Sequence, residues 1–319
     1  MRDSILYFGC NPRRCLEVIS FADLKHLTDD FESSIYDVAT KRSDEIIRLL
    51  RDTRTGASDI SHTVFQVFPS NTDPNRLYSN CQIETVSPWA LDRILHYHAA
   101  HRADLMANFY YQVSSVPAAG SLRGHLFERQ ILNHLSGIDS EKPFSIRALT
   151  NSKKKTWTYR GPIRRTDFQK LKVVPEITRA VRDQESLHLV PAARNFPAAD
   201  SILYDPEDSD AALTCIQVTS KENHPISVKG LRDIQNWLQG RTLEHIRPTK
   251  RRPWRFLFVV PSYVESNFKM QQLDGDTDRG EWAGKVHQYV LGLEEETIFG
   301  PGSNSSANTS QQGEQQVWC

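Results

Sequence analysis

The segment from Ala198 to Lys221 constrains the fold of this 319-residue chain more than any other part. It contains two short apolar stretches, Ala198–Tyr204 and Leu213–Thr219, which are joined by an acidic turn. Two such runs around a polar turn are typical of a β-hairpin. A helix is expected over 227–238 and a buried strand over 254–260. The pattern therefore predicts an α/β domain with a hairpin in its middle.

The N-terminal third has a different pattern, in which helices surround one hairpin. A helix begins at Asn11–Pro12, and strands are expected over 62–68 and 81–86. Ser87–Pro88 then supplies a cap and a first turn for a helix that ends near His101. This order predicts a mainly helical module of the lid or winged-helix type.

A break at Val116–Gly120 divides the chain into two domains. The first domain covers residues 1–117 and the second covers 118–300, with a last helix expected near 282–291. The remainder, 301–319, is rich in Gly, Ser, Asn and Gln and lacks apolar periodicity, so we expect a disordered tail.

The overall charge gives no global attraction to nucleic acid or membrane, because 39 basic residues balance 39 acidic ones. A charged partner must therefore be met by a local patch. No apolar run approaches the roughly 20 residues of a membrane-spanning helix, and no secretory signal is visible at the start. Five cysteines without paired spacing fit a reducing compartment, so we expect an intracellular protein without a membrane partner.

Polar side chains alternate along the second strand of the predicted hairpin. Gln217, Thr219 and, if the strand continues, Lys221 share one face of the sheet. If Asp200 lies opposite Gln217 on the neighbouring strand, a carboxylate, an amide oxygen and an ammonium group converge. Such a group can hold Mg²⁺ through oxygen ligands and place a lysine near a scissile phosphate. The alternative is an edge hairpin whose outward face is solvated.

Glu128, on the first helix of the second domain, is the candidate for an additional metal carboxylate. It follows two apolar residues, Leu126 and Phe127, so its side chain can face the interior. The alternative is an exposed glutamate that pairs with Arg129 or Lys142, which is the commoner situation for a lone helical glutamate.

Short motifs occur in a fixed order along nearly the whole chain. They are Asn11–Cys15, Ser87–Leu91, Leu122–Gly124 with Phe127–Glu128, Phe196–Asp200, and Gln217–Thr219 followed by His224–Ile226. In these motifs and their order the chain resembles the Crinkler and retrotransposon hot spot families of effector-like proteins. Those families pair a P-loop ATPase with a restriction-endonuclease-like domain.

The resemblance implies that the second domain has a PD-(D/E)XK nuclease fold, a restriction-endonuclease-like mixed sheet flanked by helices. It implies Mg²⁺ as the cofactor, with Glu128, Asp200 and Gln217 at the metal positions. The chain departs from the family pattern because Thr219 stands at the position of the catalytic lysine and Gln217 replaces a carboxylate. A glutamine oxygen is neutral and binds a metal more weakly. Lys221 is the candidate substitute for the missing lysine.

The resemblance also implies that residues 1–117 correspond to the C-terminal end of the ATPase module, which would make the lid-type module an ATPase lid. A phosphate-binding loop requires the pattern G-x-x-x-x-G-K-[ST], and the sequence contains none. The segment Gly280–Val286 has the wrong spacing and ends in valine. We therefore expect no ATP site. The chain resembles a truncated relative of these families that lacks the ATPase motor.

Local charge indicates a nucleic-acid partner in spite of the neutral total. Between Arg147 and Arg182 there are eleven basic residues and two acidic ones, a formal +9, and a second basic cluster follows later. The residues expected to contact DNA are Lys153, Lys154, Lys155, Trp157, Arg164, Arg165, Lys250, Arg251 and Arg252. Basic residues neutralise phosphates and aromatic ones stack on bases. The alternatives are a solvated basic face and a nuclear import signal, which makes a nuclear location one expectation.

Two functions of different classes follow from these observations. The first is a metal-dependent nuclease that acts on DNA phosphodiesters, with Lys221 and Thr219 at the catalytic positions. The second is a catalytically inactive nuclease-fold module that binds DNA or a protein partner. A further alternative is a regulatory fragment that associates, through the residues before 118, with a full-length, ATPase-bearing relative.

Overall fold

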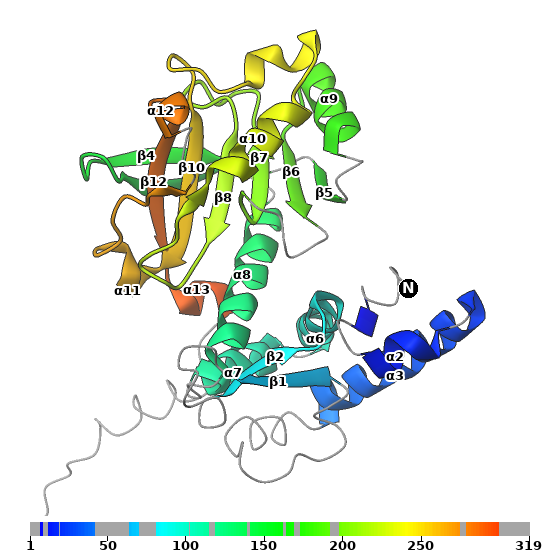
Figure 1. Ribbon diagram of the computed structural model, residues 1–319. Coiled ribbons are helices and arrows are strands. Elements are labelled where there is room, and N and C mark those ends of the chain that lie inside the picture. The colour runs from blue at the N-terminus through cyan, green and yellow to red at the C-terminus, as the bar shows by residue number, and fades with distance from the viewer. Residues whose placement is uncertain are drawn as a thin grey trace, which may run out of the picture. The chain divides into compact units, whose positions relative to one another are not determined.

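The chain forms two compact units, Met1–Leu126 with Phe299–Cys319, and Phe127–Ile298 (Figure 1). The computed structural model describes residues 7–8, 12–18, 20–41, 64–69, 81–101, 103–114, 119–138, 141–161, 164–168, 173–191, 198–274 and 279–299. The boundary expected after residue 117 falls shortly before the division between the units. The tail expected over 301–319 lies outside the described residues.

The described part of the first unit is helical apart from one hairpin. Its elements are α2 (Pro12–Glu17), α3 (Phe21–Lys41), β1 (Phe65–Pro69), β2 (Cys81–Thr85), α6 (Pro88–His101) and α7 (Ala103–Ser114). Strands β1 and β2 pair antiparallel, as the sequence predicts. Ser87 caps α6, because its Oγ accepts the backbone N–H of Ala90 at 3.1 Å. The ring of Phe31 stacks on Trp89 and so packs α3 against α6.

The second unit is an α/β domain built on a mixed sheet of eight strands (Figure 1). In chain order its elements are α8 (Gly120–Ser136), which contains the division between the units, β3 (Lys142–Ala148), β4 (Lys154–Tyr159), β5 (Arg164–Phe168), α9 (Val173–Asp183), β6 (Leu187–Pro191), β7 (Ser201–Tyr204), β8 (Thr214–Val218), β9 (Ile226–Ser227), α10 (Val228–Trp237), the 3₁₀ helix η4 (Arg241–Ile246), β10 (Trp254–Pro261), α11 (Ser262–Glu265), β11 (Leu273–Asp274), α12 (Arg279–Trp282), β12 (Val286–Leu293) and α13 (Glu295–Phe299). The strand order is β4-β3-β12-β10-β8-β7-β6-β5.

Strand β10 lies at the centre of the sheet and is buried along its whole length. It pairs parallel to both β8 and β12, and the antiparallel pairs β7–β8 and β6–β7 extend the sheet on one side. Phe256 and Phe258 point into an apolar cluster that also holds Ile177 of α9 and Ile234 of α10. Since side chains alternate along a strand, Leu257 faces the opposite side of the sheet. Helices therefore flank the mixed sheet.

The helix expected near 282–291 is wrong, because Val286–Leu293 forms strand β12. This strand pairs parallel to β10 and antiparallel to β3, so it gains backbone hydrogen bonds on both edges. Its alternation of buried Gln288 and Val290 with more exposed neighbours is a strand pattern. Tertiary pairing therefore decided the conformation of this apolar segment.

Candidate active site

Asp200 and Gln217 meet at the ends of two neighbouring strands. Asp200 directly precedes β7 and Gln217 lies near the end of β8, and these strands pair with Ser201 opposite Ile216. The side-chain amide of Gln217 donates to Asp200 Oδ2 at 2.6 Å, and the backbone N–H of Val218 donates to the same oxygen at 2.7 Å. The structure thus joins the two side chains that the sequence assigns to one site.

The surroundings of the Asp200 carboxyl group disfavour its charged form. Burial raises the pKa of Asp200 well above the ordinary carboxyl range, and the negative charge of nearby Glu128 raises it further. The hydrogen bonds from Val218 and Gln217 lower this pKa but do not cancel the increase. A cation bound between two such carboxylates would relieve their repulsion. Glu128 and Asp200 therefore form the acidic centre of the candidate site.

A buried histidine fixes the helix that carries Glu128 against the strand that follows Asp200. His188 of β6 is fully buried, with its Nδ1 3.1 Å from Ser136 Oγ of α8 and its Nε2 2.9 Å from Ser201 Oγ of β7. Ser136 donates its own proton to a carbonyl within α8 at 2.7 Å, so it accepts the proton of His188 Nδ1. The Nε2 atom then accepts from Ser201. This bridge was missed at the sequence level because its three members are far apart in the chain.

Strand β8 ends too early to place Lys221 on its face. The backbone N–H of Thr219 still donates to Val259 O of β10 at 3.0 Å, but β8 itself ends at Val218. The hydroxyl of Thr219 accepts the backbone N–H of Lys221 at 3.1 Å, which turns the chain away from the sheet. The predicted continuation of the strand to Lys221 is therefore wrong. The side chain of Lys221 is exposed on the loop that follows β8.

The donor set suits Mg²⁺ in chemical type. Glu128 and Asp200 supply carboxylate oxygens, and Gln217 carries an amide oxygen, all of them hard ligands. In the observed arrangement Gln217 turns its amide nitrogen toward Asp200. Among the described residues no three His, Cys, Asp or Glu side chains gather into a metal-binding group. The third ligand position therefore depends on a rotation of the Gln217 amide group.

Trp157 cannot stack on a nucleic-acid base, contrary to the sequence prediction. Its side chain is 4% exposed and packs with Phe144 and Tyr159. The guanidinium of Arg255 lies 5.5 Å from the centre of the Trp157 ring, so a cation–π contact covers it further. The alternation along β4 turns this aromatic residue toward the core.

Acidic residues elsewhere in the sequence neutralise two cations of the predicted basic segment. Lys155 forms an ion pair with Asp210. Arg160 pairs with Asp205 at 3.1 Å and also reaches Glu207 and Glu141 at the same distance. Lys153 and Lys154 are exposed, and neither forms an ion pair within the described part of the chain. Arg164 and Arg165 lie in β5, and their side chains fall outside the described residues.

The second predicted basic cluster is exposed but lies far from Asp200. Lys250 and Arg251 are exposed and Arg252 is partly buried, directly before strand β10. Asp200 contacts the other end of this part of the sheet, where Val218 lies opposite Val259 of β10. The five residues from Trp254 to that position span roughly 17 Å of strand. The structure does not bring the 250–252 cluster and the carboxylates together.

A buried ion pair anchors the acidic turn of the hairpin. Arg255 is 3% exposed and holds Asp208 with both terminal nitrogens, while one of them also donates to Thr214 Oγ1 at 3.1 Å. Burial raises the pKa of Asp208, but the hydrogen bonds and the charge of Arg255 outweigh it and lower this pKa overall. The sequence does not show that an arginine reaches this turn from β10, because the two residues lie 47 positions apart.

We expect Arg255→Met to lower the free energy of unfolding by about 3 to 5 kcal/mol at pH 7, because it leaves the Asp208 carboxylate desolvated and unpaired. The stabilisation that Asp208 provides exists above its unfolded pKa and is lost as the pH falls through its lower folded pKa. The difference between variant and natural chain should therefore shrink in acid. Urea denaturation at several pH values measures it, with exposed Arg241→Met as the control. Equal stability at pH 7 would contradict a structural role for the pair.

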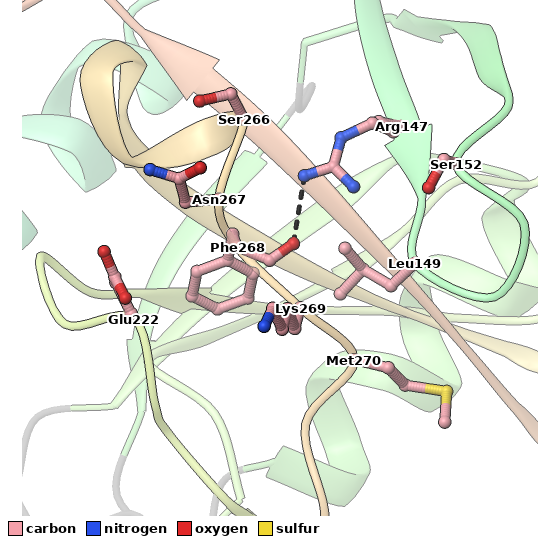
Figure 2. A pocket seen from close by; sticks show the side chains of 9 residues that line it. All are labelled: Arg147, Leu149, Ser152, Glu222, Ser266, Asn267, Phe268, Lys269 and Met270. Carbon is pink, nitrogen blue, oxygen red and sulfur yellow. Dashed lines mark hydrogen bonds between the residues drawn. The ribbon is translucent and has the colours of Figure 1, made fainter.

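An open hollow of about 440 Å³ is bordered by the end of β3, the loop after β8 and the segment after α11 (Figure 2). The residues that line it are Arg147, Leu149, Ser152, Glu222, Ser266, Asn267, Phe268, Lys269 and Met270. Buried Gln271 ties its walls together, since its Nε2 donates to Lys269 O at 2.7 Å and to Glu222 O at 3.0 Å. Its Oε1 accepts the backbone N–H of His224 at 2.6 Å. Three separate loops build this hollow, so no single motif predicts it.

No family model, curated protein or solved structure matches the chain. None of the described helices is both long and apolar enough to cross a bilayer.

Proposed function

We propose that residues 127–298 form a metal-dependent nuclease-fold domain that acts on nucleic-acid phosphodiesters, as the resemblance to the Crinkler and retrotransposon hot spot families implies. The observation that carries the proposal is the position of Asp200, a desolvated carboxyl group next to Glu128 and bonded to Gln217 at the ends of adjacent strands. The mixed sheet flanked by helices agrees with a restriction-endonuclease-like fold.

In this proposal each residue has a definite task. Glu128 and Asp200 hold Mg²⁺ through their carboxylates, and Gln217 adds its amide oxygen after rotation. The ion when bound supplies Lewis-acid polarisation of the phosphate and lowers the pKa of water. The exposed ammonium of Lys221 approaches the phosphate from the loop after β8, while Thr219 fixes that loop through its hydroxyl.

Residues 1–117 are proposed to correspond to the end of an ATPase module without a nucleotide site. The Lys250–Arg252 cluster and the exposed lysines of the β3–β4 turn are the proposed contacts to DNA. A full-length, ATPase-bearing relative is a proposed partner of the first unit. A nuclear location agrees with the exposed Lys250 and Arg251.

A second candidate function is supported by one specific observation. The Gln217 amide nitrogen already satisfies Asp200 Oδ2 at 2.6 Å, and no lysine occupies position 219. A donating amide stabilises the Asp200 carboxylate in place of a bound cation. This arrangement suits a domain that keeps the nuclease fold and binds DNA, or a protein partner, without cutting.

Nicking of supercoiled plasmid by the purified chain tests the proposal. We expect nicked product in Mg²⁺ or Mn²⁺, none in EDTA, and none from Asp200→Ala, because this change removes the central carboxylate. Asp233→Ala on α10 is the matched control and should cut normally. DNA retention without nicking in any metal would favour the inactive binding module. The absence of both signals would favour a protein partner.

A further inference from the structure

We propose that the hollow in Figure 2 holds the sugar–phosphate backbone of a nucleic-acid strand, with Arg147 and Lys269 of its lining and the neighbouring Lys154 as phosphate contacts. The inference rests on the proposed action on nucleic acid and adds the path of the strand. It joins Arg147 and Lys154, which belong to the basic segment of the sequence, with Lys269, which no sequence motif marks.

The guanidinium group of Arg147 is held in a fixed position with donors to spare. One terminal nitrogen donates to Phe268 O at 3.0 Å, the dashed line in Figure 2, and to Glu265 O. Within the described part of the chain, its other N–H groups have no hydrogen-bond partner and Arg147 forms no ion pair. A guanidinium that is already ordered loses little side-chain entropy when it binds a phosphate.

Strand register adds a second cation to the same side of the sheet. Lys154 of β4 lies directly opposite Arg147 of β3, and directly opposed residues of an antiparallel pair share a face. Ser145 and Thr156, which also pair with each other, are exposed on this face, so no helix covers it. Lys155 points to the other face, where it pairs with Asp210.

The third cation comes from the segment after α11, which also lines the hollow. Lys269 is exposed, and it forms no ion pair among the described residues. The hollow also exposes the hydroxyls of Ser152 and Ser266 and the amide of Asn267. Among the residues that line the hollow, the one carboxylate, that of Glu222, accompanies two cations, Arg147 and Lys269, and Lys154 adds a third beside Arg147. Hydrogen-bond donors around a net positive charge suit a sugar–phosphate chain.

Strand register relates the hollow to the Asp200 site, because Arg147 lies opposite Val290 of β12, Val290 opposite Phe258 of β10, and Phe258 opposite Gln217. The loop after β8 begins at Thr219, next to the Asp200–Gln217 contact, and reaches the wall of the hollow at Glu222. Three residues span at most about 11 Å. Gln271 clamps this loop to the opposite wall through Glu222 O and Lys269 O. A strand lying in the hollow is thus directed toward the proposed metal carboxylates.

Fluorescence anisotropy with a labelled single-stranded DNA oligonucleotide tests the inference. It uses the full chain in EDTA, over a range of salt concentrations, and needs no catalysis. For Lys154→Ala/Lys269→Ala we expect weaker binding. The fall of the logarithm of the association constant with the logarithm of the salt concentration should be less steep by about 1.4, or roughly 0.7 for each lost phosphate contact. Both lysines are exposed, so folding should be unchanged, which melting curves verify.

Lys229→Ala/Arg241→Ala is the matched control, because it removes two exposed cations, one of α10 and one of η4, that belong to neither basic cluster. This control should keep the natural slope. An equal effect of both double variants, an effect of the control alone, or no binding by the natural chain would each overturn the inference. The plasmid assay is independent of these outcomes. Nicking in Mg²⁺ by the natural chain, together with an unchanged salt slope for Lys154→Ala/Lys269→Ala, would support the nuclease but reject the hollow as the path of the strand.

Discussion

The double variant Gln217→Glu/Thr219→Lys should nick supercoiled plasmid in Mg²⁺ at least about a hundredfold faster than the natural chain, which is the scale of one well-placed electrostatic group. Position 217 already touches Asp200, so a glutamate there adds a third carboxylate to the acidic centre. The backbone at Thr219 is still paired to Val259, so a lysine at 219 would share the face of residue 217. Both changes restore the nuclease pattern that the resemblance implies.

Single variants and a matched control show which charge matters. Gln217→Glu alone should raise Mg²⁺ affinity, seen as a larger shift of the melting temperature on adding Mg²⁺, and should lower stability in EDTA because it replaces a donor to Asp200 by a carboxylate. Gln217→Glu/Thr219→Met is the matched control, because methionine at position 219 has a length similar to that of lysine but no charge. This variant should nick plasmid slowly. A double variant that folds and binds Mg²⁺ but cuts no faster would remove the main support for the nuclease proposal.

The sequence predicts the centre of the second unit well, because its signals are local. The strand at 254–260, the helix at 227–238 and the hairpin around the acidic turn correspond to β10, α10 and β7–β8. Asp200 and Gln217 come together because a hairpin joins strands that are neighbours in the sequence. A pairing between adjacent segments needs only the turn and the alternation of side chains to be recognised.

The remaining errors arise where distant segments meet. Trp157 looks available in the sequence, but β4 turns it into the core under Arg255. The charge of Lys155 is matched by Asp210, a residue that lies 55 positions later. His188 shows no local pattern, yet it joins α8 to β7. Charge and burial depend on such long-range contacts, and a run of basic residues does not reveal its own counter-ions.

Asp200→Asn should abolish nicking and at the same time make the protein more stable in EDTA. The substitution removes a desolvated negative charge next to Glu128 but leaves a neutral oxygen to accept the hydrogen bonds from Gln217 and Val218. For a unit of this size each 1 kcal/mol gained raises the melting temperature by about 2 to 4 °C. Functional sites often keep groups that cost stability, since their charge is needed for binding or catalysis.

The pH dependence separates this explanation from a general effect of the substitution. The folded pKa of Asp200 is raised above its unfolded value, so the protonated carboxyl favours folding at low pH and this contribution is lost as the pH rises through the folded pKa. The gain from Asp200→Asn should therefore be largest at neutral and alkaline pH and vanish in acid. Melting curves in EDTA measure it, with Asp233→Asn on α10 as the control that should show no such trend. If Asp200→Asn instead lowers the stability at neutral pH, the role of Asp200 is that of a structural hydrogen-bond acceptor. A carboxylate charge that is kept at a cost in stability is expected only where a cation is to be bound.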